Sequence, residues 1–234
     1  MVRAIRTSLI LPTYNERETL PPLLAALYPV ASGLGLEVVV VDDASPDGTA
    51  EVAATLAAQG PIPIRLLRRP GKGGLASAVL AGASIAAGGI IVVMDSDGSH
   101  PPGLIAPLVA AVAGGADVAV ASRYVAGGRI ARWPARRRLA SRVATVIARR
   151  LLRLGARDPL SGFFAARREV FTRRVYWGMG FKILLELLAR NPDLAVAEVP
   201  YTFTDRSGGQ SKLNRGEVAA YLRLIGRLLR ERGS

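Results

Sequence analysis

Two aspartates spaced two residues apart, Asp95 and Asp97, directly follow the apolar run "IIVVM" and open the stretch "DSDGSH". Residues i and i+2 of a strand share one face, so at a strand end both carboxylates can reach one ligand. Carboxylate oxygens are preferred ligands of Mg²⁺ and Mn²⁺. A turn is the competing interpretation, because Asp-Gly pairs favour turns. The apolar run before the aspartates and Ser99 after them favour a metal or ligand site.

Other reactive side chains are scarce. The chain has no cysteine and one histidine, His100, so it offers neither a thiolate site nor a nucleophilic triad, and any metal must be held mainly by oxygen. We expect His100 to be structural and Ser99 to be a weaker ligand than either aspartate.

A second acidic pair, Asp42 and Asp43, follows the apolar run "EVVVV". Acidic residues at that point commonly accept hydrogen bonds from a ribose or a base. The next turn, "SPDG", places Asp47 where it can cap the following helix. "RRPGKGG" lacks the spacing of a phosphate-binding P-loop, so we predict a tight turn into a helix there.

Arg206 and Lys212 flank a glycine pair in "DRSGGQSKL". Two cations on such a loop suit a lid that closes over a diphosphate and neutralises a departing group. A solvated loop is the alternative.

The net charge of the 234-residue chain is +13, and the charge is unevenly placed. Between Val118 and Arg157 there is no acidic residue but a dense series of arginines. Such a segment calls for an anionic partner: nucleic acid, a phospholipid surface or a phosphorylated substrate. The arginines are Arg123, Arg129, Arg132, Arg136, Arg137, Arg138, Arg142, Arg149, Arg150, Arg153 and Arg157.

The elements that must position these residues alternate between short apolar runs and helical patterns. This alternation indicates an α/β fold, a mainly parallel sheet covered by helices. Strands are predicted at Ser8–Leu11, Glu37–Val41, Ile64–Leu67, Ile90–Met94 and Val118–Ala121, and helices at Glu18–Leu27, Thr49–Gln59, Gly74–Ala87 and Leu104–Val112. Polar segments follow four of the strands: "PTYNE", "DDASPDG", "DSDGSH" and "SRYVAGG". Ligands bind beyond the carboxyl ends of strands in such sheets, so these segments should converge on one crevice.

The second half predicts two basic amphipathic helices, Trp133–Leu154 and Glu217–Arg232, with a strand at "AVAEVPYTF" between them. The first carries an apolar side formed by Leu139, Val143, Val146, Ile147, Leu151 and Leu154. We divide the chain into a main domain, residues 1–214, and a C-terminal helix, residues 215–234.

Two segments of the chain are apolar enough to be compared with a membrane-spanning helix or a signal peptide. The uncharged stretch Gly73–Met94 is long enough to span a bilayer, but Gly88-Gly89 divides it, so a buried helix, turn and strand are predicted. The apolar run near the N-terminus is too short for a signal peptide, so we expect a cytoplasmic protein.

Together these motifs resemble the polyprenyl (dolichyl) phosphate mannose synthases, inverting glycosyltransferases of the Rossmann-like GT-A fold. The resemblance rests on "LPTYNE", "VVDDASPDGT", "MDSDGSHPP", "SRYVAGG", "SGFFAARREV", "GFKILLELL" and "EVPYTFTDRSGGQSKL", which run from Ser8 to about Leu213. Many relatives add transmembrane helices after the catalytic domain, so we expect either the subtype without them or a relative whose membrane region is not part of this sequence.

The resemblance implies a role for each matching residue. Asp95, Asp97 and Arg123 would be catalytic. The donor would be bound by Pro12, Tyr14, Glu16, Val41, Asp43, Ser96, Asp97, Arg123, Arg206 and Lys212. The acceptor phosphate would be bound by Arg123, Arg137 and Ser141, and the metal by Asp95, Asp97 and Ser99. Gly98 departs from the pattern, because the family usually has leucine there.

The implied activity is metal-dependent, inverting transfer of mannose from GDP-mannose to a polyprenyl phosphate, with Mg²⁺ or Mn²⁺ as cofactor. A phosphate monoester is mostly a dianion near neutral pH, so no strong protein base is needed. The basic helices then suit peripheral docking on the anionic cytoplasmic face of a membrane, where each basic residue contributes roughly 1 kcal/mol. The resemblance also allows a membrane-anchoring partner subunit, and nucleic acid is not expected as a partner.

Two alternatives stay open. One is the same fold with another donor, such as UDP-glucose. The other is a non-enzymatic basic module that binds membrane or nucleic acid, which the strand-end aspartates disfavour because they would repel a phosphate backbone.

Overall fold

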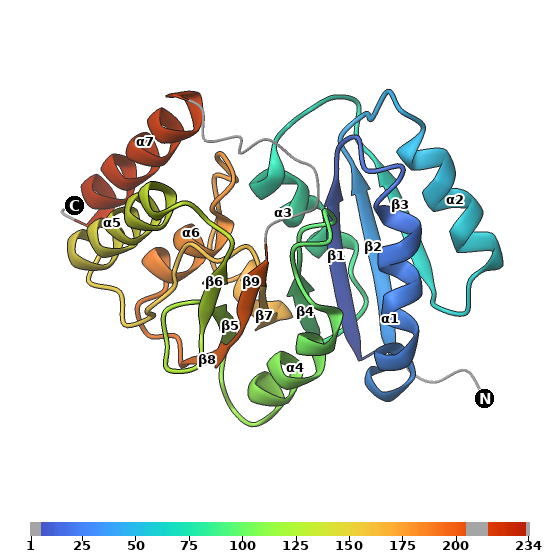
Figure 1. Ribbon diagram of the computed structural model, residues 1–234, viewed down its shortest axis with the longest axis horizontal. Coiled ribbons are helices and arrows are strands. Elements are labelled where there is room, and N and C mark those ends of the chain that lie inside the picture. The colour runs from blue at the N-terminus through green and yellow to red at the C-terminus, as the bar shows by residue number, and fades with distance from the viewer. Residues whose placement is uncertain (1–5, 205–214, 233–234) are drawn as a thin grey trace.

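The computed structural model describes residues 6–204 and 215–232, which form a central seven-stranded sheet with helices on both faces (Figure 1). The strands of this sheet are β1 (Thr7–Thr13), β2 (Leu36–Asp42), β3 (Ile64–Arg68), β4 (Ile90–Val93), β5 (Val118–Ser122), β7 (Phe164–Arg167) and β8 (Val196–Pro200). Their order is β3-β2-β1-β4-β7-β5-β8. The helices are α1 (Leu20–Leu34), α2 (Thr49–Gln59), α3 (Leu75–Ile85), α4 (Ile105–Ala113), α5 (Ala135–Leu151), α6 (Ile183–Arg190) and α7 (Arg215–Arg232), with short 3-10 turns at Pro102–Leu104 and Arg168–Phe171.

The sheet is parallel except at β7, which runs antiparallel to both β4 and β5. In the first half each strand is followed by a helix, and β1 pairs in parallel with β2 and β4. The fold class is therefore as predicted. The antiparallel strand is one that the sequence pattern did not predict, because "FAAR" is only four residues long and shows no alternation of apolar and polar side chains.

Alternation along the buried strands divides the core in two. Leu9 and Leu11 of β1 face one side of the sheet, where α1 and α4 pack, and Ile10 between them faces the other side, where α3, α6 and α7 pack. Residues i and i+2 thus reach the same layer throughout the sheet. The segment Gly73–Met94 forms α3, a turn and β4 in this core, as predicted.

Three predicted elements need correction. The helix expected at Glu18–Leu27 is α1, which begins at Leu20 and continues to Leu34, where Gly35 takes a left-handed conformation (φ 56°). The helix expected at Trp133–Leu154 begins at Ala135 and ends at Leu151, because Arg153 takes a left-handed conformation (φ 46°) and Leu154 turns back into the core. The strand expected at "AVAEVPYTF" is two strands. β8 ends at Pro200, and after Tyr201 the chain forms β9 (Thr202–Thr204), which leaves the main sheet and pairs with β6 (Arg129–Ala131).

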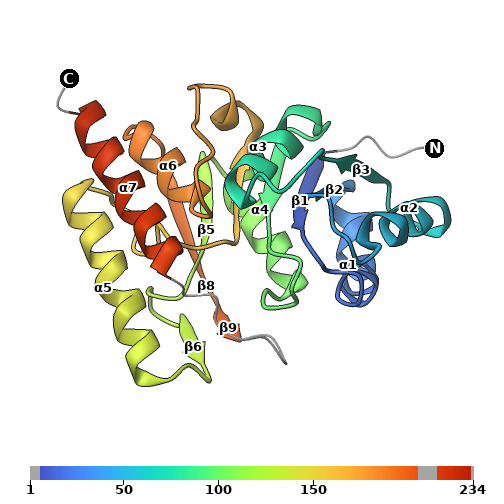
Figure 2. The same cartoon turned by 90° about the horizontal axis from the view of Figure 1, so that it is seen from above.

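The two basic helices α5 and α7 lie side by side at one end of the molecule (Figures 1 and 2). The Tyr221 hydroxyl of α7 donates a hydrogen bond to the Ala144 carbonyl of α5 at 2.7 Å. α7 also buries Leu224, Ile225 and Leu228 in the core that α3 and α6 share. None of the helices in the described ranges is both long and apolar enough to cross a bilayer.

Candidate active site at the carboxyl ends of the strands

The carboxyl ends of β1, β2 and β4 meet, as predicted for the polar segments that follow them. The Ser96 hydroxyl, just past β4, donates to the Pro12 carbonyl of β1 at 2.9 Å. The backbone N–H of Asp43, just past β2, donates to the Thr13 carbonyl of β1 at 3.1 Å. Ser96 is buried, so its hydroxyl fastens the loop of residues 95–99, which we call the aspartate loop, to the sheet.

Asp95 and Asp97 flank Ser96 and remain partly accessible. The Asp95 side chain is 33% exposed, and one of its carboxylate oxygens lies 3.4 Å from Nε2 of the buried His100. Asp97 accepts a hydrogen bond from the backbone N–H of Ser99 at 3.0 Å. Gly98 between them has a φ of +75°, a conformation that glycine adopts without strain and leucine does not. The departure from the family pattern at Gly98 therefore matches the turn that the loop takes.

These two carboxylates fit a hard divalent cation that is completed by the substrate. Among the described residues no group of three or more His, Cys, Asp or Glu side chains could hold a metal. Mg²⁺ is commonly bound through one or two carboxylates together with substrate phosphates and water. Two accessible carboxylates on one loop therefore fit a cation that arrives with a diphosphate, and Ser99, which is buried, adds little open surface.

Asp43 holds a loop instead of standing free. One carboxylate oxygen accepts hydrogen bonds from the backbone N–H groups of Gly73 and Gly74 at 3.1 and 3.0 Å, and the other pairs with Arg69 at 2.8 Å. The segment "RRPGKGG" is thus a turn into α3, as predicted, and Asp43 clamps it beside the strand ends. In this position Asp43 fixes that loop beside the carboxyl end of β2.

The other predicted donor residues lie around the same strand ends. The Tyr14 ring lies 3.6 Å from the Lys72 ammonium of the clamped loop. Glu16 accepts a hydrogen bond from the Thr19 hydroxyl. Val41 is fully buried in the core, and its carbonyl accepts a hydrogen bond from the Thr13 hydroxyl at 3.3 Å, so it presents no surface to a ligand in this structure.

Asp47 has the structural role expected of it. Its carboxylate accepts a hydrogen bond at 3.0 Å from the backbone N–H of Thr49, the first residue of α2. The capping position itself is taken by Gly48, one residue later than predicted.

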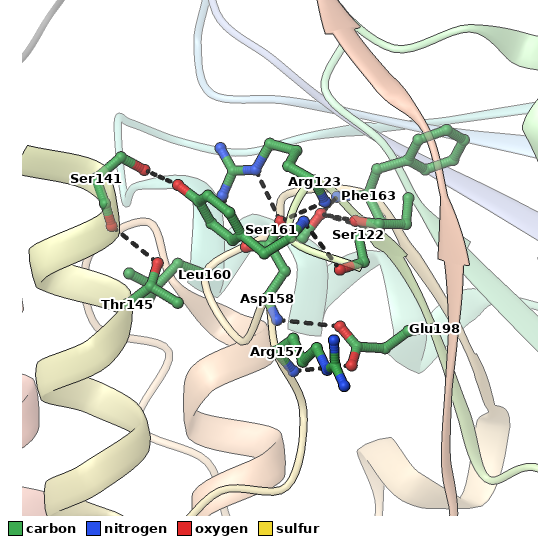
Figure 3. Close-up of polar contacts among 12 residues, drawn as sticks. Ser122, Arg123, Ser141, Thr145, Arg157, Asp158, Leu160, Ser161, Phe163 and Glu198 are labelled. Atoms are coloured by element: carbon green, nitrogen blue, oxygen red, sulfur yellow. Dashed lines mark hydrogen bonds and ion pairs between the residues drawn. The ribbon is translucent and has the colours of Figure 1, made fainter. Parts of the chain in front are cut away.

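Arg123, just past β5, is held by a partner that the sequence did not reveal. Its guanidinium binds Asp158 through Nε at 2.7 Å and Nη2 at 2.8 Å, and its backbone N–H donates to the same carboxylate at 3.0 Å (Figure 3). Asp158 is fully buried and Arg123 nearly so. Burial opposes the charge of Arg123, but the hydrogen bonds and negative charge of Asp158 outweigh it and raise the pKa of the guanidinium above its ordinary value.

The predicted acceptor residues of α5 lie next to this ion pair. The Ser141 and Tyr124 hydroxyls are hydrogen-bonded at 2.8 Å. The guanidinium of Arg137 stacks on Trp133, 3.9 Å from the ring centre. Figure 3 shows Ser141 projecting from α5 toward the Arg123 side of the cluster.

An aromatic chain joins the aspartate loop to these acceptor residues. The His100 ring, beside Asp95, lies 5.8 Å from Phe203, and Phe203 lies 5.2 Å from Trp133, on which Arg137 stacks. A series of ring contacts therefore links the aspartate loop to Arg137. His100 is structural in this arrangement, as expected.

Tyr201, which interrupts the predicted last strand, lies between the two ends of this site. Burial raises the pKa of its hydroxyl, the positive charge of Arg123 opposes that rise, and the negative charges of Asp158 and Asp95 add to it. Tyr201 thus lies close enough to Asp95, Asp158 and Arg123 for the charge of each to affect its hydroxyl.

Sequence reasoning missed three contributors: Asp158, Tyr201 and Gly162. Gly162 packs against Asp95, because a Cβ atom added to it would lie 2.9 Å from an oxygen of that carboxylate. The stretch "DPLSGF" carried the signal for two of them, because a charged residue and a glycine inside an otherwise apolar segment indicate a buried partner and a close backbone approach. Arg206 and Lys212, predicted to form a lid, lie outside the described residues.

Comparison with known proteins gives the class and the family. The mostly parallel, Rossmann-like sheet with flanking helices is that of a glycosyltransferase with the GT-A fold. Residues 8–174 match the family described as glycosyl transferase family 2, and the chain belongs to that family.

Three curated relatives carry related names. A dolichol-phosphate mannosyltransferase of Pyrococcus furiosus is 43% identical over 98% of this chain and 65% of its own length, so the chain spans about two thirds of that relative. The polyprenol monophosphomannose synthase of Mycolicibacterium smegmatis is 40% identical over 97% of this chain and 91% of its own. A dolichol-phosphate mannosyltransferase of Saccharomyces cerevisiae is 37% identical over 95% and 86%. The resemblance to the polyprenyl phosphate mannose synthases is confirmed.

Solved structures confirm the fold. Mannosyl-3-phosphoglycerate synthase of Rubrobacter xylanophilus superimposes with a TM-score of 0.75 over 98% of this chain and 75% of that chain, at 21% identity. Glucosyl-3-phosphoglycerate synthase of Mycobacterium tuberculosis, solved with Mn²⁺, UDP and glucosyl-3-phosphoglycerate, has a TM-score of 0.71 over 97% of this chain and 79% of that chain, at 25% identity.

Proposed function

We propose that this glycosyltransferase moves mannose from GDP-mannose to the phosphate of a polyprenyl lipid. The observation that carries the proposal is the identity of 37–43% to three relatives named for mannose transfer to dolichol or polyprenol phosphate. The cluster of Arg123, Arg137 and Ser141 beside the strand ends supports a phosphorylated acceptor.

The chain's own residues suit this chemistry. The acceptor phosphate is already mostly a dianion near neutral pH, so it attacks the anomeric carbon without a protein base. The obstacle is the approach of two anions, which Arg123 and Arg137 ease by placing positive charge at the acceptor end. An in-line attack opposite the departing diphosphate inverts the configuration of the sugar.

A divalent cation, Mg²⁺ or Mn²⁺, is part of the proposal. Asp95 and Asp97 would hold it, and it would stabilise the charge that develops on the departing nucleoside diphosphate. Mn²⁺ accompanies UDP in the Mycobacterium tuberculosis structure, and the partly exposed carboxylates of Asp95 and Asp97 support the same kind of site here.

A donor panel tests the proposal. GDP-mannose, UDP-glucose and UDP-N-acetylglucosamine are each offered with a short polyprenyl phosphate and Mg²⁺ or Mn²⁺, and lipid-linked sugar is measured by mass spectrometry. We expect product with GDP-mannose. Product with UDP-glucose alone would favour the second candidate, which the UDP-bound neighbour supports. No product with any donor from folded protein would contradict the assignment.

We further propose that α5 and α7 dock the enzyme on the anionic cytoplasmic face of a membrane. The apolar side predicted on α5 is largely exposed, and its Leu139 is 64% exposed. On the neighbouring α7, Leu222 is 55% exposed. Arg136, Arg138 and Arg142 of α5 are exposed as well, within three residues of Leu139 along the helix. Apolar side chains flanked by cations on paired helices suit the boundary between lipid headgroups and acyl chains.

Liposome pelleting with the purified protein tests the docking surface. Binding to anionic liposomes should weaken as salt rises, and Leu139→Gln combined with Leu222→Gln should weaken it further. Val175→Gln is the matched control, because Val175 is 85% exposed but lies on another segment. Equal pelleting at low and high salt, or an equal loss in the Val175 control, would contradict the proposal.

A further inference from the structure

The loop between α5 and β7 is built around Asp158. Glu198 of β8 accepts the backbone N–H groups of Arg157 and Asp158 at 2.8 and 3.0 Å, which fixes the loop to the sheet. Ser161 further along donates its hydroxyl to the Ala121 carbonyl of β5 at 2.8 Å. Figure 3 shows Asp158 between the Arg123 side chain above it and Glu198 below. The Asp158 carboxylate is therefore held in a fixed place, with no exposed surface.

Both oxygens of the Asp158 carboxylate accept hydrogen bonds from Arg123. One oxygen accepts the Arg123 backbone N–H and Nε, and the other accepts Nη2. A carboxylate fixed by three hydrogen bonds in a buried site is poorly placed to take a proton from a substrate. The acceptor phosphate needs no such base, so Asp158 serves another purpose.

The Nη1 edge of the Arg123 guanidinium is the edge that Asp158 does not bind. Within the described residues, Nη1 of Arg123 makes no hydrogen bond, and the guanidinium carbon lies 5.3 to 6.0 Å from the rings of Tyr124, Trp133 and Phe203. A guanidinium that is clamped on one edge presents its other edge in a single orientation.

We propose that Asp158 is a positioning residue: it orients Arg123 so that the Nη1 edge binds the acceptor phosphate, and it acts on the reaction only through Arg123. This inference deepens the proposed function and rests on it.

Steady-state kinetics of Asp158→Asn test the proposal. The asparagine keeps the shape of the side chain but loses its charge and one acceptor oxygen. We expect kcat/KM for the polyprenyl phosphate to fall about 10- to 100-fold, as for other residues that orient a binding group, mainly through KM. KM for the nucleotide sugar and the pH profile of kcat should be unchanged. Asp193→Asn is the matched control, because Asp193 forms an exposed ion pair with Arg173.

A double-mutant comparison separates positioning from a merely structural role. In an Arg123→Ala background, adding Asp158→Asn should leave kcat/KM nearly unchanged. The double variant should also melt at a higher temperature than Arg123→Ala alone, because that single variant leaves a buried carboxylate without its partner. Losses that multiply would show that Asp158 acts independently of Arg123 and would overturn the proposal.

Two further results would separate a failure of the Asp158 proposal from a failure of the proposed function. If Asp158→Asn yields no folded protein, Glu198→Gln loosens the same loop with the carboxylate intact, and it should raise the acceptor KM by a smaller factor. The positioning role alone would be overturned if the wild type is active and the acceptor KM is unchanged in the Asp158 or Glu198 variant. It would also be overturned if the variant lost the acid or the alkaline limb of its pH profile of kcat. A wild type inactive with every polyprenyl phosphate would instead overturn the proposed function.

Discussion

Gly162 offers a sharp test of how the aspartate loop is positioned. It follows Ser161 in the loop before β7, and a Cβ atom added there would lie 2.9 Å from an oxygen of the Asp95 carboxylate. Ordinary contacts to a Cβ begin at 3.4 Å, so Gly162→Ala must displace that carboxylate by about 0.5 Å. Misplacing a reacting group by about 1 Å can cost about 100-fold in rate, so we expect about a tenfold loss of kcat.

Metal titration with the Gly162→Ala protein is the direct assay, because it does not depend on turnover. Binding of Mn²⁺ in the presence of GDP should weaken by a similar factor, about tenfold, as expected when a metal ligand is misoriented. Gly155→Ala is the matched control, since a Cβ there meets nothing within 4 Å. Unchanged Mn²⁺ affinity and kcat in Gly162→Ala, with a melting temperature equal to that of the control, would refute the assigned place of Asp95 in the metal site.

Further predictions concern catalysis and stability. Asp97→Ala should abolish transfer in the lipid-linked sugar assay and leave liposome binding intact; parallel loss of both would contradict a separate catalytic site. Asp47→Ala should lower the free energy of unfolding by about 1 kcal/mol, because α2 loses its N-terminal hydrogen bonds, while kcat/KM stays unchanged; denaturant titration and kinetics check both. Burial raises the pKa of the Glu186 carboxyl, against the hydrogen bonds from Trp177 and Gly178. The folded state thus binds this proton more tightly than the unfolded state, and the contribution of Glu186 to stability falls as the pH rises from the ordinary pKa of 4.5 through the raised value. Glu186→Gln should flatten that fall in melts across the pH range, and an identical pH dependence would contradict it.

Local patterns were enough to predict the first half of the fold. The apolar runs before Asp43 and Asp95 are buried parallel strands, and the helix predicted at Thr49–Gln59 has those bounds in the structure. Each of these elements depends on its own residues and on a turn directly after it. The convergence of the strand ends followed from topology, because parallel strands end at the same edge.

Long-range pairing decided what the sequence could not reveal. The strand β7 enters the sheet antiparallel between β4 and β5, and no local periodicity signals such an insertion. Asp158 is 35 residues from Arg123, and its partnership is visible only once β7 brings its loop under the end of β5. The end of α5 at Leu151 likewise depends on Leu154 finding a place in the core, which helical spacing alone did not predict.

The anomeric configuration of the product tests the central claim most directly. GDP-mannose and a short polyprenyl phosphate are incubated with the purified protein and Mg²⁺ or Mn²⁺, and the lipid-linked product is examined by NMR. The proposed function predicts mannose joined to the lipid phosphate in the β configuration, inverted from the α-linked donor, with no product from the Asp97→Ala protein run alongside. An α-linked product, or mannose transferred equally well by Asp97→Ala, would contradict it.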